Sequence, residues 1–431
     1  MWSNLVSYLR GRRILVWGFG TEGASSASFL QRHLPGQSFV ITDSDPARVQ
    51  SILYNDRAIE FLSEVDALTR LSEFDLILKS PGISLLKFRF PPNVMEKIRG
   101  QSDLFLQFAP GHLIGVTGTK GKSTTSSLIA HLLQTQARST PLVGNIGVPP
   151  WNVIKNLDDE SICVIELSSY QLEGTRYSPK IAVLLNLYQE HLNYHGSLEA
   201  YWRAKWNITL HQKPGDTLIY NESIPEIVTR VRDRSGVSAH AFGLVKPFQF
   251  SLEGCLALRG NHNLSNAQAA VLTAKGFGVS DETVQKRLLS YKGLPHRLEF
   301  VGVCNEITYY NDSISTVPES AMAALAALSE TETIILGGQN RGVDYTQLAE
   351  VLRASQLSTI ILVSETGEIL RDLLMPDSRI RWVHHLTEAM QIAKRETRSG
   401  GTCLFSPAAP SYNQFQNFEE RGNLFKQLTV T

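Results

Sequence analysis

Short apolar runs alternate with longer stretches of helical spacing along most of the chain. In the first hundred residues, "RRILVWGFGTEG" (12–23), "QSFVITDSD" (37–45) and "FDLILKSPGIS" (74–84) each contain such a run, followed closely by glycine, aspartate or proline. Strands that alternate with helices in this way are typical of a parallel sheet with crossover helices. The pattern therefore predicts a small parallel α/β domain over residues 1–110.

The rest of the chain repeats this alternation in two further blocks. Proline and glycine near 110 and near 295 mark their edges, so we predict three domains, with the bounds 1–110, 111–295 and 296–431. The apolar runs predicted as strands in the second and third blocks are "HLIGVT" (112–117), "ICVIELS" (162–168), "IAVLLNL" (181–187), "TIILGG" (333–338), "TIILVS" (359–364) and "GTCLFSPA" (401–408).

Composition narrows the range of partners. Lysine plus arginine and aspartate plus glutamate number 41 each, so the formal net charge is zero, and no basic surplus points to a nucleic-acid or membrane partner. Any anionic ligand must then be met by local positive charge. No run of about 18 apolar residues occurs, and the four widely spaced cysteines favour reduced thiols over disulfides or a metal cluster. We expect a soluble, cytoplasmic enzyme.

The stretch "GVTGTKGKSTT" (115–125) is typical of a phosphate-binding loop. It joins an apolar strand to a helix-like run, and glycine-rich turns at such junctions point backbone N–H groups at phosphate oxygens. Lys122 would neutralise the terminal phosphates and Ser123 would ligate Mg²⁺. Val116 stands where the strict pattern has glycine, and the alternative is an ordinary glycine turn before a surface helix. The predicted ATP-binding residues of the loop are Gly118, Thr119, Lys120, Gly121, Lys122, Ser123 and Thr124.

Three titratable residues follow the next two predicted strands. Glu166 ends its strand, where parallel sheets present ligands and where a carboxylate can hold Mg²⁺. His191 follows the next strand, and Lys205 lies on a helix that Ser197 is predicted to cap. Each has a structural alternative, as a solvated strand end, a structural histidine and a solvated helix cation respectively.

The first block carries a glycine-rich turn of its own. Residues 18–23 fit the spacing G-x-G-x-x-G after a strand, and Asp43 ends the next strand. Taken alone this is a dinucleotide fingerprint, but a lone match is weak, and the same geometry serves any pyrophosphate.

Together, the motifs resemble the Mur ligases. They cover all three blocks in the right order, which makes the match specific although each motif alone is weak. The loop of that family, TGT-x-GK-[ST], does not require the early glycine that Val116 replaces. The motifs are "TGTKGKST" (117–124), "GNIG" (144–147), "ELSSYQLE" (166–173), "EHLNYHG" (190–196), "GNHNLSNAQAA" (260–270), "GLPHRLE" (293–299), "NDS" (311–313) and "SPAAPSYNQFQNFEERG" (406–422).

The resemblance implies a three-domain α/β ligase with a Rossmann-like UDP-binding domain, a P-loop-type ATPase domain and a Rossmann-like amino-acid-binding domain. The members that the chain resembles most add glutamate to UDP-N-acetylmuramoyl-L-alanine in peptidoglycan precursor synthesis. They use ATP to form an acyl phosphate and release ADP and phosphate. Because the carboxylate and the γ-phosphate are both anions, cations must surround them. We expect a monomer that acts on these small molecules.

The resemblance also implies site roles, residue by residue. Lys122 would hold the γ-phosphate. Ser123 and Glu166 would hold one Mg²⁺, and His191 a second. Lys205 matches a lysine that is carbamylated in the family. Carbamylation converts a cation, which would repel Mg²⁺, into an anionic ligand. The adenine-nucleotide contacts would be Asn266, Arg297 and Asp312, the last two bringing the third domain onto ATP. The UDP-muramoyl-alanine contacts would be Gly20, Thr21, Glu22, Asp43, Ser80, Pro81, Gly82, Asn145, Ser168 and Gln171.

The amino-acid end departs from the family pattern. After "NDS" the family has lysine where this chain has Ile314, and "GGDxKG" reads "GGQNRG", with Gln339 for aspartate and Arg341 for lysine. Arginine can still clamp a carboxylate, with two hydrogen bonds where lysine acts as a point charge. Ser411 and Phe418 match family residues near the bound glutamate. We predict Arg341, Ser411 and Phe418 as amino-acid-binding residues, and we favour D-glutamate over the alternative, L-glutamate.

Three other classes of protein are weighed against this one. A nicotinamide-dependent dehydrogenase would use the turn at 18–23 but leaves the Lys122 loop without a purpose. A folylpolyglutamate synthase-like ligase would share the ATPase and C-terminal blocks but lacks a UDP-type first domain. A non-enzymatic nucleotide-binding switch would need neither the carbamate lysine nor an amino-acid pocket.

Overall fold

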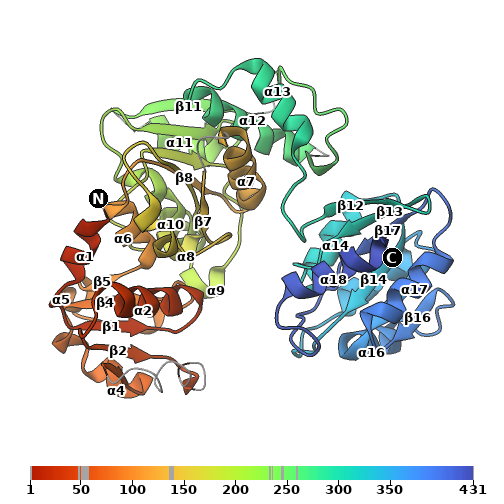
Figure 1. Ribbon diagram of the computed structural model, residues 1–431, viewed down its shortest axis with the longest axis horizontal. Coiled ribbons are helices and arrows are strands. Elements are labelled where there is room, and N and C mark those ends of the chain that lie inside the picture. Colours follow the sequence, from red (N-terminus) through yellow and green to blue (C-terminus); the bar gives the residue numbers. More distant parts are fainter. Residues whose placement is uncertain are drawn as a thin grey trace. The chain divides into compact units, whose positions relative to one another are not determined.

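The computed structural model describes residues 2–46, 49, 58–134, 140–232, 234, 236–243, 247–258 and 261–430. The chain divides into two compact units (Figure 1). Unit 1 comprises Met1–Ser251 and His262–Arg287, and unit 2 comprises Leu252–Asn261 and Leu288–Thr431. Among the described residues, no helix has both the length and the apolar character needed to cross a membrane.

Unit 1 begins with a five-stranded parallel sheet in the order β3-β2-β1-β4-β5. Its central strand β1 (Ile14–Trp17) is buried along its whole length, as expected of a parallel strand covered on both faces. The other strands are β2 (Phe39–Thr42), β3 (Ile59–Phe61), β4 (Leu76–Lys79) and β5 (Ile98–Arg99). The helices are α1 (Ser3–Leu9), α2 (Thr21–His33), α4 (Glu64–Thr69), α5 (Pro92–Met95) and α6 (Gln101–Phe108), with 3₁₀ turns η2 (Leu71–Glu73) and η3 (Leu85–Lys87).

The second sheet of unit 1 has six parallel strands in the order β11-β10-β9-β6-β8-β7. Because its strands are parallel, the segments that follow β6, β8 and β9 leave the sheet at one edge. The strands are β6 (His112–Thr117), β7 (Leu142–Gly144), β8 (Ile162–Glu166), β9 (Ile181–Leu184), β10 (Thr217–Asn221) and β11 (Ser238–Phe242). The helices are α7 (Lys122–Leu133), α8 (Ser169–Leu172), α9 (Leu192–His195), α10 (Leu198–Leu210), α11 (Pro225–Arg232), α12 (Asn261–Gly276) and α13 (Asp281–Ser290), with η4 (Pro150–Asn152) and η5 (Ile154–Asn156).

Unit 2 holds a third sheet, in the order β12-β13-β17-β14-β15-β16, in which only the pair β12–β13 is antiparallel among the described strands. Its strands are β12 (Glu299–Cys304), β13 (Ile307–Asn311), β14 (Thr331–Gly337), β15 (Thr359–Val363), β16 (Ile380–Val383) and β17 (Thr402–Phe405). Its helices are α14 (Pro318–Ala327), α15 (Thr346–Ala354), α16 (Ser364–Leu374), α17 (Leu386–Glu396) and α18 (Phe418–Val430), with η6 (Leu256–Leu258).

The two sheets of unit 1 share one apolar core, which extends from β1 and α2 to β8 and β10. At the junction, Phe29 of α2 packs on Trp151 of η4 with ring centroids 4.9 Å apart. The edge predicted near residue 110 therefore falls between two sheets that pack together in one unit. The predicted three-domain division stays a prediction.

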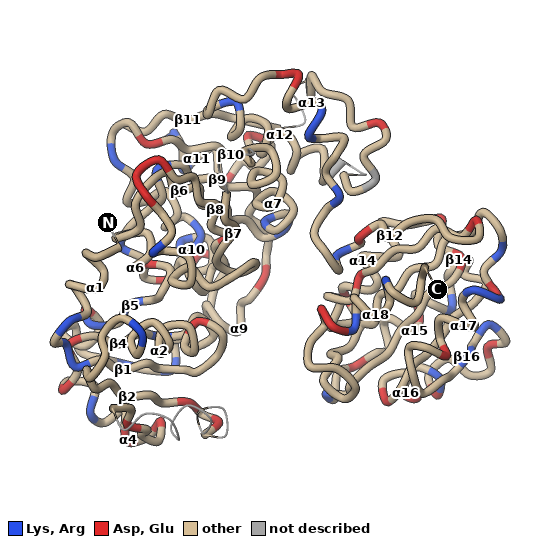
Figure 2. The backbone as a smooth tube through the Cα atoms, in the orientation of Figure 1, with Lys and Arg blue, Asp and Glu red and all other residues tan. Residues whose placement is uncertain are grey.

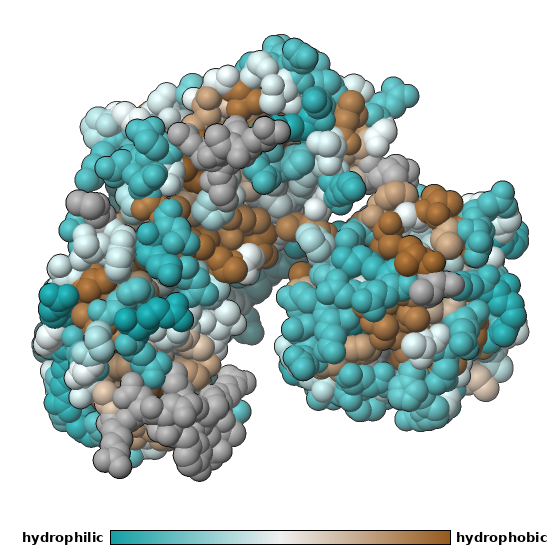
Figure 3. All heavy atoms as spheres, in the orientation of Figure 1, coloured by the Kyte–Doolittle hydropathy of each residue, from teal (hydrophilic) through white to brown (hydrophobic). Residues whose placement is uncertain are grey.

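The surface of the described residues has mixed character. In the view of Figure 2, the basic and acidic segments are interspersed, in keeping with the equal numbers of the two charges. Hydrophilic side chains cover most of the visible face in Figure 3, with smaller apolar patches between them. Isolated exposed apolar residues such as Val303 and Met375 are ordinary for a folded protein.

All nine strands predicted from apolar runs are present, and parallel pairing is confirmed in all three sheets. Several of the strands that the sequence did not indicate are short or half-exposed. β3 and β11, for example, lie at sheet edges, and several of their side chains are exposed. Such strands lack the continuous apolar run that identifies a buried parallel strand, so their sequences resemble loops.

Candidate functional site

The loop between β6 and α7 has the backbone of a phosphate-binding turn. Gly121 caps α7 with φ of 83°, a left-handed conformation that favours glycine. Asn186, after β9, holds the loop in place: its side-chain oxygen accepts the Lys120 N–H at 2.8 Å, and its amide donates to the Lys120 carbonyl at 3.0 Å. α7 then begins at Lys122, so the first-turn N–H groups and the helix dipole lie at the loop.

Two lysines converge on one carbonyl of this loop. Lys122 Nζ donates to the Gly118 and Thr119 carbonyls, both at 3.0 Å, and Lys205 Nζ donates to the same Gly118 carbonyl at 2.7 Å. Lys205 is fully buried. Burial first, and the nearby Lys122 second, lower its pKa well below the usual range. The Lys205 amine beside the loop therefore loses its proton more readily than an exposed lysine does. The predicted helix carrying Lys205 and its Ser197 cap are confirmed.

Glu166 presents an unsatisfied oxygen at the same edge of the sheet. It is the last residue of β8 and is fully buried. Asn145 Nδ2 donates to Glu166 Oε1 at 2.7 Å, whereas Oε2 is buried with no hydrogen-bond partner. A buried carboxylate oxygen without a partner is costly unless a ligand completes it. The structural alternative of a solvated strand end is therefore wrong for Glu166.

His191 lies at the N-terminus of α9 and is half-exposed, with φ of 56°. Its ring packs between Tyr170, at a centroid distance of 5.0 Å, and Tyr201, at 6.0 Å. Burial lowers its pKa, Glu190 opposes that shift, and Lys205 and other lysines add to it. The charged form of the ring is therefore disfavoured, and the neutral form is the one in which histidine ligates metals.

Two further residues that were predicted to bind ATP, Ser123 and Asn266, also lie at the phosphate loop. Ser123 is buried in the first turn of α7. Asn266 of α12 rests on Gly121, where a Cβ would come within 2.3 Å of the Asn266 amide oxygen. Of the motif around Asn266, Gly260 lies outside the described residues. Among those that are described, no group of three or more His, Cys, Asp and Glu side chains could hold a metal by itself.

The glycine turn of the first sheet is held by hydrogen bonds from neighbouring segments. Gly18 has φ of 89°, and the Ser80 hydroxyl donates to its carbonyl at 2.8 Å. Asp43, which follows β2, accepts the Phe19 N–H of the turn at 2.5 Å and the Asp45 N–H of its own loop at 2.8 Å. Asp43 therefore shapes the turn, and its predicted contact with UDP stays a prediction.

The contacts predicted for muramoyl-alanine join the two sheets of unit 1. Ser168 and Gln171 form a capping box on α8. The Gln171 amide also donates to Glu22 Oε1 at 2.6 Å. Burial raises the pKa of Glu22 to about 7, against the opposing effects of Gln171 and Lys79. The remaining predicted contacts from the first sheet, which lie on its glycine turn and on the loop after β4, are Gly20, Thr21, Pro81 and Gly82.

In unit 2, Asp312 follows β13 and is buried. It accepts hydrogen bonds from the Ser406 hydroxyl at 2.7 Å and from the Leu298 N–H at 3.1 Å. Burial raises its pKa to about 7, and neighbouring Arg297, which is exposed, acts in the other direction. The predicted role of Arg297 and Asp312 toward ATP stays a prediction.

The predicted amino-acid residues lie on the segments that leave β14 and β17. Arg341 is exposed, donates to Gln339 and lies over the Tyr412 ring at 5.3 Å. Ser411 is buried and lines a pocket with Arg421, while Phe418 begins α18. Arg341 thus contacts Tyr412, the residue that follows Ser411.

Arg421 is the residue of unit 2 that sequence reasoning missed. Its guanidinium is buried and donates to the Ser313 hydroxyl, the Ser313 carbonyl and the Ala409 carbonyl at 2.8–3.1 Å. Burial lowers its pKa to about 9. An arginine that directly follows two glutamates, as in "NFEERG", resembles a surface helix charge, so the sequence carries no signal for this burial. In unit 1, Asn186 and Tyr201 were missed for the same reason, because their partners are far away along the chain.

Two family models match parts of this chain. Residues 116–252 match the Mur ligase middle domain, and residues 296–409 match the Mur ligase glutamate ligase domain. The UDP-N-acetylmuramoylalanine–D-glutamate ligase of Koribacter versatilis is 32% identical over 453 residues, which cover 97% of each chain. The UDP-N-acetylmuramoyl-L-alanine–L-glutamate ligase of Salinispora tropica is 33% identical over 459 residues, which cover 98% of each chain.

Solved structures share the fold at much lower sequence identity. The UDP-N-acetylmuramate–alanine ligase MurC from Thermotoga maritima gives a TM-score of 0.57 at 18% identity, covering 96% of this chain and 99% of that one. The MurF ligase from Thermotoga maritima, solved in complex with ADP, gives 0.55 at 16% identity, covering 97% and 98%. At these identities the likeness shows the α/β fold alone.

Proposed function

This chain belongs to the Mur ligase family, ATP-dependent enzymes that join an acid to an amino acid, and we propose that it adds glutamate to UDP-N-acetylmuramoyl-L-alanine. The product would be a peptidoglycan precursor, formed with release of ADP and phosphate. The relatives named for this reaction match the chain along nearly its whole length. We further propose that the first sheet forms a Rossmann-like UDP-binding domain, the second a P-loop-type ATPase domain, and the third a Rossmann-like amino-acid-binding domain.

One observation carries the proposal. Lys122 and Lys205 converge on the Gly118 carbonyl, and buried Glu166 keeps one oxygen without a partner at the same sheet edge. Two lysine side chains and a buried carboxylate oxygen that has no hydrogen-bond partner therefore lie at one edge of the sheet. The phosphates of a nucleoside triphosphate would pair with the lysines, and its Mg²⁺ would pair with the Glu166 oxygen. Cations placed in this way are what phosphoryl transfer between two anions needs.

The residues fit the metal and the modification that the family implies. Ser123, Glu166 and His191 would hold Mg²⁺, which supplies charge neutralisation between the phosphates and the attacking carboxylate. The unpartnered Glu166 oxygen is the group that such an ion would complete. Lys205 fits carbamylation because a neutral amine is the form that adds to CO₂, and its pKa is strongly lowered. The carbamate would add a second anionic ligand.

In the proposed reaction, the carboxylate oxygen of the acid substrate attacks the γ-phosphorus, and the bond from that phosphorus to the β-phosphate oxygen breaks. Lys122 would hold the γ-phosphate through this step, and the loop N–H groups at Gly118–Gly121 would orient the remaining phosphates. The glutamate nitrogen then attacks the carbonyl carbon of the acyl phosphate, phosphate leaves, and the nitrogen loses a proton. Asn145, which holds Glu166 in place, is proposed to lie near the reacting carboxylate.

The identity of the glutamate enantiomer is a separate question. Relatives named for D-glutamate and for L-glutamate match this chain at 32–33% identity. Arg341, Ser411 and Phe418 are proposed to contact the amino acid. We favour D-glutamate and keep L-glutamate as the second candidate.

Phosphate release tests the proposal directly. The purified enzyme is assayed with MgATP and UDP-N-acetylmuramoyl-L-alanine, and D-glutamate, L-glutamate and other amino acids are added separately. Phosphate and the peptide product should form in equal amounts with one glutamate enantiomer and in far smaller amounts with other amino acids. Absence of turnover with every amino acid would overturn the proposed function.

A further inference from the structure

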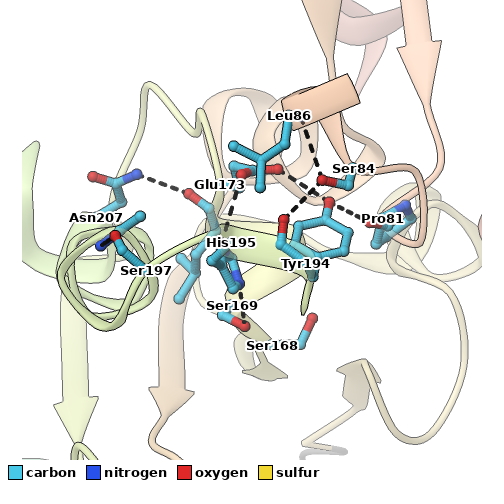
Figure 4. Close-up of polar contacts among 12 residues, drawn as sticks. Pro81, Ser84, Leu86, Ser168, Ser169, Glu173, Tyr194, His195, Ser197 and Asn207 are labelled. Carbon is cyan, nitrogen blue, oxygen red and sulfur yellow. Dashed lines mark hydrogen bonds and ion pairs between the residues drawn. The ribbon is translucent and has the colours of Figure 1, made fainter. Parts of the chain in front are cut away.

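Where the two sheets of unit 1 meet, a polar network ties α9 to the loop after β4 (Figure 4). Tyr194, on the single turn that follows His191, is buried. Its hydroxyl lies 2.7 Å from the Pro81 carbonyl and 2.9 Å from the Ile83 carbonyl. The Ser84 hydroxyl donates to the Tyr194 carbonyl at 2.8 Å. Tyr194 therefore holds this loop through both its side chain and its main chain.

The Tyr194 hydroxyl has two further polar neighbours. Glu173 Oε2 lies at 3.0 Å and Lys79 Nζ at 3.5 Å. Burial, reinforced by Glu173, raises the pKa of the phenol far above its usual range, so the hydroxyl keeps its proton. Lys79 Nζ also donates to the Ile83 carbonyl at 2.8 Å and the Ser80 carbonyl at 3.2 Å. The loop is therefore fixed by donors from both sheets of unit 1.

From Tyr194, an aromatic column continues to the phosphate loop. Tyr170 stacks on Tyr194 with centroids 4.0 Å apart and ring planes inclined by 28°. Tyr170 also contacts His191, and His191 contacts Tyr201 edge-on. Tyr201 then donates from its hydroxyl to Thr119 Oγ1 at 3.0 Å. Each ring rests on the next, so a displacement at the loop after β4 has a packed route to His191 and Thr119.

We propose that Tyr194 is a positioning residue that couples the loop after β4 to the phosphate loop, so that a nucleotide diphosphate bound at the first and Mg-nucleotide bound at the second strengthen each other. The proposal rests on the proposed function, which assigns Ser80, Pro81 and Gly82 to the UDP end of the acid substrate. Tyr194 acts through Tyr170 and His191 and contacts no reacting atom. The coupling is a property of this network and is separate from the chemistry of ligation.

Binding measurements test the coupling without turnover. Isothermal titration gives the Kd of UDP with and without the Mg²⁺ complex of a non-hydrolysable ATP analogue, and the reverse pair. In the natural enzyme, each ligand should lower the Kd of the other by the same factor, on the order of 5- to 20-fold, because coupling is reciprocal. Tyr194→Phe keeps the ring stack but removes the hydroxyl, and should bring this factor below about 2. The Kd of each ligand alone should change by less than about threefold.

Ser84→Ala is the second variant, because it removes the other tie between the loop and α9 and leaves Tyr194 intact. It should lower the coupling factor by a smaller amount. Tyr177→Phe is the matched control: it lies at the same junction, with the Arg99 guanidinium 5.7 Å from its ring, but outside the column. It should keep the natural factor. Steady-state kinetics at saturating acid substrate should show a raised KM for ATP in Tyr194→Phe, by about the coupling factor that is lost, because the bound acid substrate no longer lowers the Kd of ATP.

The outcomes separate two failures. If both ligands bind the natural enzyme but neither affects the other, or if Tyr194→Phe and Ser84→Ala both keep the natural factor, the coupling proposal is overturned. If the natural enzyme binds no UDP, the proposed function fails and the coupling proposal fails with it. A loss of coupling in Tyr177→Phe as large as in Tyr194→Phe would also overturn it, since the effect would then belong to the junction as a whole.

Discussion

The two glycine turns of unit 1 have similar backbones and different surroundings. In each, a parallel strand turns through a glycine with φ near 85°, Gly18 with 89° and Gly121 with 83°, into a helix. At the first turn, the carboxylate of Asp43 accepts the Phe19 N–H of the turn and the Asp45 N–H of its own loop. In the second, Lys122 and Lys205 converge on one carbonyl, and Glu166 keeps a bare oxygen nearby.

The difference shows how one local geometry serves two purposes. A strand-to-helix glycine turn supplies inward N–H groups and a helix dipole wherever it occurs. Whether it does chemistry depends on the charged groups that the rest of the fold brings to it. The carboxylate at the first turn has hydrogen-bond partners on both oxygens, whereas the carboxylate at the second has one buried oxygen without a partner, and we propose binding for the first turn and reaction for the second. Substitutions at the two turns should therefore have effects of different kinds.

The largest effect is expected at the second turn. Lys122→Ala removes the cation that would meet the γ-phosphate, so ADP formation should fall by at least about 10³-fold in kcat. Coupled-enzyme detection of ADP measures this. Lys180→Ala, which changes an exposed lysine away from the turn, is the control and should keep natural activity. Near-natural kcat in Lys122→Ala would remove this turn from the reaction.

Lys205→Ala should also be nearly inactive, with a loss of about 10²–10³-fold, because an anionic metal ligand would be missing. Added short-chain carboxylates should restore part of the activity by occupying the vacated space. The same carboxylates should not rescue Lys122→Ala, which makes that variant the matched control. Full activity of Lys205→Ala without any carboxylate would contradict the carbamate proposal.

At the first turn, the expected effect is on stability. A Cβ at Gly23 would lie 2.0 Å from the Gly18 carbonyl oxygen, so Gly23→Ala forces the helix away from the turn. We expect a loss of about 3 kcal/mol in the free energy of unfolding. Urea unfolding followed by far-UV circular dichroism measures it. Gly20→Ala is the control, because a Cβ there meets no atom within 4 Å, and it should be nearly neutral.

The smallest effect is expected at Glu22 and depends on pH. Because its folded pKa is about 7, above the ordinary value of 4.5, folding takes up a proton between these values, and stability is lost as pH rises from 4.5 through 7. Glu22→Gln removes this loss, so the variant should be more stable than the natural protein at pH 8. We expect the free energy of unfolding to rise by about 2 kcal/mol. This is less than the whole pKa shift would give as a free energy, because the Glu22 side chain is only part-buried.

Thermal unfolding at pH 5 and pH 8 checks the sign. The advantage of Glu22→Gln should shrink toward pH 5, where the natural carboxyl is itself protonated. Equal advantages at both pH values would mean that the buried charge is not the cause.

The phosphate loop was recognisable from sequence because all its parts are adjacent along the chain. β6, the glycines and the first turn of α7 lie within residues 112–125, and their local spacing alone indicates phosphate binding. Glu166 was a candidate from its place at the end of a strand, and the role of Lys205 was assigned by resemblance. Their burial and the missing partner of Glu166 Oε2 are properties of packing between β8, α10 and the loop, which no local pattern encodes.

The network at Tyr194 lay beyond sequence reasoning altogether. Pro81 and Tyr194 are 113 positions apart, and each stands in a segment with its own local explanation. Arg421 is a similar case, since two neighbouring glutamates suggest a solvated helix face while the guanidinium is in fact buried against Ser313 and Ala409.

By itself, the sequence determined the alternation of strands and helices, the parallel pairing, the phosphate loop and the family. These follow from hydrophobic periodicity and from residues close together along the chain, where local geometry is enough. Only the tertiary structure decided which groups far apart along the chain meet: Lys122 and Lys205 at the Gly118 carbonyl, Asn145 and the buried carboxylate of Glu166, and the aromatic column from Tyr194 to Thr119. The reason is physical, because desolvation and pairing depend on neighbours in space, and strands far apart in sequence supply those neighbours.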